Sequence, residues 1–426
     1  MSGVKNIAII GAGTLGNGIT QAVLLADFEK VYLHDINQDV LDNAVKKIET
    51  TMVFLDDVKN QEKVPRDDQS ASNLFPNINL EKVISNAYCV GRFAEGCTPK
   101  EIMDRLSTST DLKHVINDVD YIIESVPEKL ELKKKIFQDL HKGSPSHAIL
   151  STNSSSLSIT RIAESSGRPE KVIGMHFFSP LMRQLIEITK GDQTDDNSVQ
   201  IGKEVGSRLP CFTGKRKIII LEKESPGFIA NRIQASGSLY ISLVLDQAYE
   251  KGIPWEQLDA DVTFLMQTGF CEMVDLIGVD VVFDVLKYLE GALSPDFAPG
   301  LVLTKMVEDG NLGQKSGKGF YEWKEDGTLK TPLNKDIKAG IIDLKTLFAI
   351  QLNEGCRLLE EGVVSGYKVI DDAMLYGYGN PGPFGMGKTN YQEWCTKLED
   401  LAKRTNKPYL NPCKLMKSGE FRKMKK

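Results

Sequence analysis

The chain begins with short apolar runs that alternate with a helical pattern. Residues 6–10 form an apolar run, a glycine-rich turn follows, and residues 31–35 form a second short run whose last two residues, His34 and Asp35, are polar. Between the turn and the second run, the stretch from about Asn17 to Ala26 has the pattern of a helix. Because short strands joined by helices are typical of parallel sheets, this segment predicts a strand-helix-strand unit.

The same alternation continues as far as about residue 224. It predicts strands at 121–124, 148–151 and 172–175 and a helix at 129–140. Because strands that alternate with helices pair in parallel, we expect an α/β fold with a doubly wound parallel sheet. A charged helical stretch from about 41 to 106, broken near Pro65 and Pro76, is expected as an insertion in this domain.

Long helical patterns replace the alternation after the apolar run Ile218–Leu221. We therefore expect the sheet domain at 1–224 and two all-α helical domains at 225–335 and 336–426. The division of the helical part rests on a weak repeat with an offset of about 110 residues. The repeat equates Glu250-Lys251-Gly252 with Glu360-Glu361-Gly362, Leu258-Asp259 with Ile370-Asp371, and Lys305-Met306 with Leu415-Met416. The turn at 380–384 has no counterpart in the first copy.

Composition and charge indicate a soluble globular protein. Of the 426 residues, 41% are apolar and 26% are charged, and the net charge is -6. An acidic balance without long single-sign blocks argues against nucleic acid or an anionic membrane as the partner. The seven cysteines contain no C-x-x-C pair, so we expect reduced thiols in the cytoplasm and no metal site. No apolar run reaches membrane-spanning length, and we expect no leader sequence.

The glycine-rich turn carries the clearest binding signal. Its sequence is Gly11-Ala12-Gly13-Thr14-Leu15-Gly16, a G-x-G-x-x-G fingerprint between a strand and a helix. Gly11 permits the tight turn, Gly13 lets a pyrophosphate approach the backbone, and Gly16 lets the helix pack closely. The amides at the helix start, with Thr14 and Leu15, hold the phosphates. Asp35 ends the second strand and is placed to bind a ribose diol, so the sequence predicts a Rossmann-type site for NAD rather than NADP.

One histidine is the first candidate for acid-base chemistry. The chain has five histidines, and His176 opens the run His176-Phe177-Phe178-Ser179-Pro180 after a predicted strand. Glu187 follows eleven positions later and supplies a carboxylate that can orient the ring. A histidine here is either a general base or a core side chain bound to a backbone carbonyl, and the segment by itself leaves both open. Glu124, residues 153–156 and His176 all follow predicted strand ends, where ligands of such sheets bind.

Several further motifs, in one order, point to a family. The sequence resembles the L-3-hydroxyacyl-CoA dehydrogenase family over nearly its whole length. With its duplicated helical domain and Ser179, it is similar to the dehydrogenase half of the multifunctional fatty-acid oxidation proteins, standing alone. The further motifs are Ile123-Glu124-Ser125-Val126, Asn153-Ser154-Ser155-Ser156-Leu157, Leu185-Ile186-Glu187-Ile188, Ser225-Pro226-Gly227-Phe228-Ile229-Ala230-Asn231-Arg232 and Gly313-Gln314-Lys315-Ser316-Gly317-Lys318-Gly319-Phe320-Tyr321.

The resemblance implies a role for each candidate residue. His176 would be the general base, and Glu187 would fix its tautomer and stabilise the imidazolium. Ser155 and Asn231 would hydrogen-bond the reacting oxygen or the acyl thioester. The implied cofactor contacts beyond the glycine turn and Asp35 are Glu124, Lys129, Ser155, Ser179 and Lys315.

The implied activity is NAD-dependent oxidation of an L-3-hydroxyacyl-CoA, for example 3-hydroxybutyryl-CoA, to the 3-ketoacyl-CoA by hydride transfer. Two alternatives stay open: a dehydrogenase of a free 3-hydroxy acid or sugar acid, similar to gulonate dehydrogenases, and an inactive structural nucleotide-binding relative. Basic residues compatible with the phosphates of CoA lie at Lys46, Lys47, Lys59, Lys63 and Arg66. The resemblance implies a homodimer, while a duplicated helical domain is equally compatible with a monomer.

Two departures from the shorter family members concern the histidine and its carboxylate. Ser179 stands where those members often have Asn, and the segment between Pro180 and Glu187 is one residue shorter. The distance between His176 and Glu187 therefore decides whether the two residues act as a pair.

Overall fold

The computed structural model describes residues 3–60, 91, 96–264 and 268–425. The chain forms two compact units. The sheet unit contains residues 1–228 and 372–381, and the helical unit contains residues 229–371 and 382–426. The sequence predicts a domain boundary near residue 224, and the first break between the two units lies four residues later, after Phe228. The further division of the helical part near residue 335 stays a prediction.

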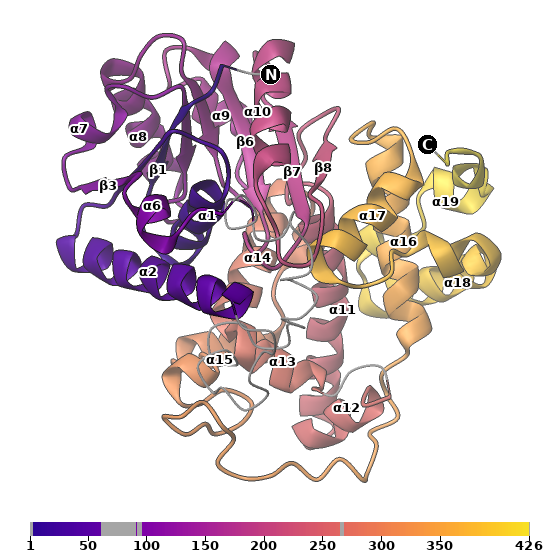
Figure 1. The fold of residues 1–426 in the computed structure, drawn as a ribbon. Helices are drawn as coiled ribbons and strands as arrows, with labels where there is room; N and C mark the ends of the chain where they lie inside the picture. Colours follow the sequence, from indigo (N-terminus) through magenta and orange to yellow (C-terminus); the bar gives the residue numbers. More distant parts are fainter. Residues whose placement is uncertain (1–2, 61–90, 92–95, 265–267, 426) are drawn as a thin grey trace. The chain divides into compact units, whose positions relative to one another are not determined.

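The sheet unit is built on an eight-stranded sheet within the described residues (Figure 1). The strand order is β3-β2-β1-β4-β5-β6-β7-β8. The strands are β1 Asn6–Ile10, β2 Lys30–His34, β3 Leu106–Ser109, β4 Tyr121–Glu124, β5 Ile149–Thr152, β6 Val172–Phe177, β7 Leu185–Lys190 and β8 Lys217–Ile220. The central strands are rich in buried isoleucine, such as Ile7, Ile9 and Ile123, which is the pattern of parallel strands covered on both faces.

Helices connect the strands and cover them. They are α1 Thr14–Leu25, α2 Gln38–Asn60, α6 Pro99–Met103, α7 Leu112–Ile116, α8 Leu130–Gly143, α9 Ile159–Ala163 and α10 Asp196–Arg208, with a 3-10 turn η2 at Pro169–Lys171. α1 packs against β1 and β2, and α10 packs against β6, β7 and β8. α10 begins where the Asp195 side chain accepts a hydrogen bond from Ser198 N, and it buries Val199 and Val205 on one face.

The structure confirms the predicted α/β fold with its doubly wound, mainly parallel sheet, and it adds one antiparallel pairing. Pairing is parallel throughout the described sheet except between β6 and β7, which are antiparallel. The connection from Phe177 to Leu185 is too short for the crossover that parallel neighbours need, so the chain turns straight back. The predicted parallel sheet thus includes one antiparallel pairing, between β6 and β7, which the sequence did not indicate. Of the expected insertion, α2 and α6 are described, whereas Pro65 and Pro76 lie outside the described residues.

The helical unit is built around a long central helix, α11, which packs against α16. The helices are α11 Ala230–Glu250, α12 Trp255–Asp261, α13 Phe270–Ile277, α14 Val279–Ala292, α15 Leu301–Glu308, α16 Leu344–Glu360, α18 Phe384–Thr405 and α19 Lys414–Ser418, with 3-10 turns η3 Pro295–Phe297, η4 Gln314–Ser316, η5 Pro408–Leu410 and η6 Glu420–Lys423. The fully buried Arg232 of α11 donates to Glu354 at 2.6 Å and to Glu361 at 2.5 Å. A buried guanidinium needs such partners, so these bonds fix α11 against α16.

One contact recurs at the positions that the sequence repeat equates. Asp259 of α12 accepts hydrogen bonds from the backbone N–H groups of Cys271 and Glu272 at the start of α13. Asp371 accepts one from Phe384 N at the start of α18. Asp371 lies in α17, Tyr367–Tyr378, a helix that begins in the helical unit and ends in the sheet unit. The recurrence supports the expected duplication, although the domain limits themselves stay a prediction.

The described cysteines are all free thiols, and Cys211, Cys271, Cys356 and Cys413 are buried. Each fills the place of a small apolar side chain. Among the described helices, none combines the length and the apolar character that crossing a bilayer demands.

Candidate active site

The glycine turn between β1 and α1 is shaped by contacts that exclude a side chain at two of its positions. Gly11 has φ of +105°, and a Cβ atom on it would lie 2.5 Å from Ser125 O. A Cβ atom on Gly16 would lie 1.8 Å from Gly11 O. Both positions therefore require glycine for the turn to form.

The middle glycine of the turn faces open space. Gly13 has no atom within 4 Å of the place where a Cβ would stand. It is the N-cap residue of α1 and offers no side-chain cap, and the following Thr14 and Leu15 are exposed. The first amides of α1 are thus presented at an exposed helix N-terminus, which suits a phosphate group.

Asp35 follows β2 and is fixed beside the glycine turn. Its Oδ2 accepts a hydrogen bond from Ala12 N at 2.9 Å, and its Oδ1 accepts one from Asn37 N at 3.1 Å. The next residue, Ile36, is 89% exposed. We had not singled out Ile36 from the sequence, although an apolar residue directly after a strand-end carboxylate is the signal that would have found it.

His176 and Glu187 form a buried pair across two strands. They stand directly opposite each other in the antiparallel register of β6 and β7, so their side chains share one face. His176 Nδ1 lies 2.8 Å from Glu187 Oε2, and the two residues are 4% and 0% exposed. The shorter connection before Glu187 therefore does not separate the pair. With Nδ1 donating to the carboxylate, Nε2 is the ring nitrogen that can accept a proton.

Aromatic side chains surround this imidazole. The ring centroids of Phe178 and Phe228 lie 4.5 Å and 5.7 Å from that of His176. The end of β6 is also tied to the loop after β5, because Phe177 N donates to Asn153 Oδ1 at 2.8 Å. This tie brings the loop that carries Ser155 to the strand that carries His176.

The loop after β5 is held by a carboxylate that our sequence predictions did not include. Glu128 Oε1 accepts hydrogen bonds from Ser155 N at 2.9 Å, Ser156 N at 3.1 Å and Ser154 Oγ at 2.5 Å. Burial by itself would raise the pKa of Glu128, but the charge of Lys133 and the serine donors bring it below its usual value. Glu128 is therefore an ionised anchor for the serine loop. Its position in the loop between a strand end and a helix start was the available signal.

Glu124 is placed differently from what the sequence suggested. It is fully buried, and its Oε1 accepts from Lys133 Nζ at 2.7 Å and from Val126 N at 2.6 Å. Its Oε2 accepts from Thr152 Oγ1 at 2.6 Å. Both oxygens thus support the interior of the sheet, and the side chain has no exposed surface for a cofactor contact. For this reason we no longer assign a cofactor contact to the Glu124 side chain.

Lys129 and Ser179, two further predicted cofactor contacts, lie at element ends of the sheet unit. Lys129 is exposed at the N-cap position of α8 and makes no side-chain cap there. Ser179 is half-buried, and its carbonyl accepts from the N–H groups of Met182 and Arg183 in the turn between β6 and β7. Their cofactor roles stay predictions.

Asn231 and Lys315 belong to the helical unit, whereas the other candidates belong to the sheet unit. Asn231 is the second residue of α11 and is half-buried. Lys315 lies in η4, and its Nζ donates to Asp280 Oδ2 at 2.7 Å. The loop around it is anchored by Asp275, which accepts from Phe320 N at 2.8 Å and Trp323 Nε1 at 2.9 Å. The roles of Asn231 and Lys315 likewise stay predictions.

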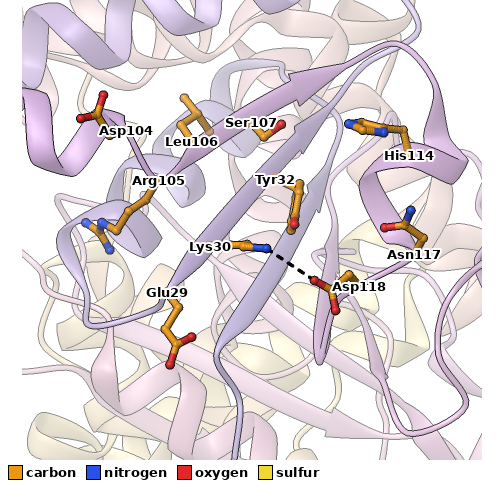
Figure 2. A pocket seen from close by; sticks show the side chains of 10 residues that line it. All are labelled: Glu29, Lys30, Tyr32, Asp104, Arg105, Leu106, Ser107, His114, Asn117 and Asp118. Carbon is orange, nitrogen blue, oxygen red and sulfur yellow. Dashed lines mark ion pairs between the residues drawn. The ribbon is translucent and has the colours of Figure 1, made fainter.

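A hollow of about 550 Å³ lies elsewhere on the sheet unit (Figure 2). It opens near the beginnings of β2 and β3, with Lys30 and Leu106 among its lining residues, and Lys30 forms an ion pair with Asp118 at 3.6 Å. Asp35 follows the other end of β2, and the glycine turn follows the same end of the parallel strand β1. The hollow is therefore not part of the candidate site.

Family models match most of the chain. The model for the 3-hydroxyacyl-CoA dehydrogenase NAD binding domain matches residues 6–94 and 78–219. The model for the C-terminal domain of 3-hydroxyacyl-CoA dehydrogenase matches residues 227–323. Together they span the glycine turn, the histidine and carboxylate pair, and the loop of Lys315.

Individual relatives agree with these models. The chain is 30% identical over 325 residues to a 3-hydroxybutyryl-CoA dehydrogenase of Bradyrhizobium diazoefficiens, covering 75% of this chain and 96% of that protein. It is 27% identical over 440 residues to a fatty acid oxidation complex subunit alpha of Vibrio parahaemolyticus, covering 98% of this chain but 56% of that subunit. This chain thus spans little more than half the length of the Vibrio protein.

A solved structure shares the fold over the full length. The 3-hydroxybutyryl-CoA dehydrogenase of Escherichia coli K12 aligns with a TM-score of 0.73 at 24% identity, covering 99% of both chains. The two family models together match well over half of this chain, and a relative covered almost completely reaches 30% identity. The chain therefore belongs to the 3-hydroxyacyl-CoA dehydrogenase family of NAD-dependent oxidoreductases.

Proposed function

We propose that this protein interconverts an L-3-hydroxyacyl-CoA, for example 3-hydroxybutyryl-CoA, and the corresponding 3-ketoacyl-CoA. The observation that carries the proposal is the buried His176–Glu187 pair at 2.8 Å, on the sheet that also carries a dinucleotide turn. A proton acceptor oriented by a carboxylate is what the oxidation of a secondary alcohol requires. The names of the relatives support an acyl-CoA thioester as the substrate.

The residues around the glycine turn fit NAD. The open space at Gly13 leaves room for a pyrophosphate, and the first amides of α1 would bind it. Asp35 would bind the ribose hydroxyls, and the exposed Ile36 would lie against the adenine. When bound, NAD supplies the acceptor for the hydride.

Proton transfer is the task of His176. Its Nε2 would take the substrate's hydroxyl proton during oxidation and return it during reduction. Glu187 keeps Nδ1 protonated and stabilises the imidazolium, because an unpaired cation at this buried position would be costly. Positioned acid-base groups of this kind contribute about 10²–10⁴-fold in rate.

The remaining candidates would position the reactants. Ser155, held by Glu128 through its backbone N–H, would donate its hydroxyl to the reacting oxygen or to the cofactor. We transfer the cofactor contact first expected at Glu124 to Glu128, whose side chain is partly exposed. Asn231, Lys129, Ser179 and Lys315 keep their proposed roles.

A reductase assay with the purified full chain tests the proposal. NADH consumption would be compared for acetoacetyl-CoA, a long-chain 3-ketoacyl-CoA and a free 3-keto acid. Turnover of a CoA thioester, lost in His176→Gln, is the expected result. Turnover of the free acid alone would support the sugar-acid alternative, and no turnover with any of the three would support the inactive structural alternative.

The cellular setting and the assembly state are proposed from the cysteines, the family and the packing of the helices. The free thiols favour the cytoplasm. A homodimer follows from the family, whereas the packing of α11 on α16 within one chain favours a monomer. Sedimentation of the purified chain distinguishes the two forms.

A further inference from the structure

A segment from late in the chain, residues 372–381, belongs to the sheet unit. It consists of the second half of α17 and the turn that follows. An ion pair of 2.8 Å joins Asp372 to Lys217 at the start of β8. Lys217 Nζ also lies 5.7 Å from the centroid of the Tyr376 ring. These contacts fasten the segment to the edge of the sheet.

The helix end approaches the connection between β6 and β7 closely. A Cβ atom on Gly377 would lie 3.0 Å from the Leu185 side chain and 3.2 Å from the ring of Phe178. Gly379 has φ of +81°, and its N–H donates to Leu375 O, which ends the helix there. The face of α17 that carries Gly377 therefore lies against the β6–β7 hairpin, which carries the proposed base.

One aromatic side chain links this segment to the pair. The Tyr378 ring meets Phe178 edge-on, with centroids 5.3 Å apart and planes at 79°. Phe178 in turn lies 4.5 Å from the imidazole of His176. Tyr378 is also near Glu187: burial raises the pKa of its phenol, and the Glu187 carboxylate raises it further, so the phenol stays neutral. Tyr378 is thus close to both members of the pair.

The helices α12 and α17, which the sequence repeat equates, differ in how far they continue past the shared aspartate. α12 ends at Asp261, two residues after Asp259, whereas α17 continues to Tyr378, seven residues after Asp371. The longer helix carries Tyr378 past the position equivalent to the end of α12, into the segment 372–381 that belongs to the sheet unit.

We propose that Tyr378 is a positioning residue for the His176–Glu187 pair, acting through the ring of Phe178. Phe178 is half-buried and lies in a turn, so its contact with the imidazole depends on what holds it from the other side. The edge-on ring of Tyr378 supplies that support. A slightly misplaced base loses much of its rate, so the support bears on turnover rather than on cofactor binding. The inference rests on the proposed function of His176.

Three variants test the proposal. Tyr378→Ala removes the ring, and Tyr378→Phe keeps it. Leu375→Ala is the matched control, because Leu375 lies one turn earlier in α17 and is 48% exposed. With acetoacetyl-CoA, we expect Tyr378→Ala to lower kcat about tenfold or more with an unchanged KM for NADH. Tyr378→Phe should restore kcat, and Leu375→Ala should match the wild type.

A second readout does not depend on turnover. The five histidines give few signals in a ¹⁵N-histidine NMR spectrum, and the signal missing in His176→Gln identifies His176. We expect its Nδ1 resonance to shift or broaden in Tyr378→Ala and to stay in place in Leu375→Ala. If the wild type turned over no substrate while this shift occurred, the proposed function would fail and the positioning role would stand.

Other outcomes overturn the positioning role. These are wild-type kcat and an unmoved His176 signal in Tyr378→Ala, an equal loss in Leu375→Ala, or no recovery in Tyr378→Phe. If Tyr378→Ala does not fold, Tyr378→Leu keeps an apolar side chain without the flat ring, and the same outcomes apply to it.

Discussion

The turn after β1 and the hairpin of β6 and β7 hold the two halves of the proposed chemistry by different means. At the turn, Gly11 and Gly16 are fixed by backbone contacts with near neighbours in the same motif and with Ser125. In the hairpin, His176 and Glu187 meet because two strands pair in one register. The glycine turn thus depends on contacts within and beside one short motif, whereas the catalytic pair depends on the register of two strands. Substitutions should therefore separate the two halves cleanly.

The largest effect is expected at the base. His176→Gln removes the proton acceptor and should lower turnover about a thousandfold, within the usual range for a general base. NADH affinity, measured by fluorescence titration, should stay nearly unchanged because the glycine turn is untouched. His147→Gln is the control, since that histidine is exposed and bound to Asp120. If His176→Gln kept substantial activity, another group would have to be the base.

The glycine turn offers a matched pair of variants. Gly16→Ala places a methyl group against Gly11 O and should cost about 1–3 kcal/mol of unfolding free energy. Gly13→Ala meets no protein atom, so its stability should stay near that of the wild type while NADH binding weakens about tenfold or more. Urea unfolding and NADH titration measure the two effects. Equal NADH affinity in Gly13→Ala and wild type would remove this turn from the cofactor site.

Asp35 tests cofactor choice within the same half. Asp35→Ala removes a carboxylate that would accept from the ribose and repel a 2′-phosphate, so the preference for NADH over NADPH should fall about tenfold. kcat/KM for the two cofactors gives the ratio. Asp42→Ala, an exposed carboxylate of α2, should leave the ratio unaltered. An unchanged ratio in Asp35→Ala would contradict the assignment.

The smallest effect concerns the anchor of the serine loop. Because the pKa of Glu128 is lowered in the folded protein, its stabilisation is complete above the unfolded pKa of about 4.5 and is lost as the pH falls through the lower folded value. The unfolding free energy of wild type should therefore exceed that of Glu128→Gln at about pH 7, and the difference should shrink at about pH 4. Urea unfolding at the two pH values measures it. A difference independent of pH would mean that the charge of Glu128 is not what holds the loop.

Much of the fold and of the cofactor half could be predicted because its signals are local. The strand at 6–10, the three glycines and Asp35 occur within one short stretch, and each has a steric or hydrogen-bonding reason that the sequence displays. The antiparallel direction of β7 could not be predicted, because pairing direction depends on partners and not on the apolar run itself.

Burial explains why the cofactor contact that the sequence predicts at Glu124 differs from the structure. Glu124 ends β4 and Glu128 lies in the loop that follows it, and only the structure shows that Lys133 and Thr152 engage Glu124 internally. The contact between Tyr378 and Phe178 could not be predicted either, because about two hundred residues separate them in the sequence and no periodicity links the two.

The place of β7 in the strand order has a consequence for how the protein inactivates. β7 is next to β8, which ends the described sheet, whereas β1 is flanked by β2 and β4 in its middle. Outer strands open more readily than central ones in local fluctuations. Amide hydrogen exchange should therefore be faster in β7 and β8 than in β1. On mild heating the protein would then lose turnover while it still binds its dinucleotide, and cooling would restore the lost activity.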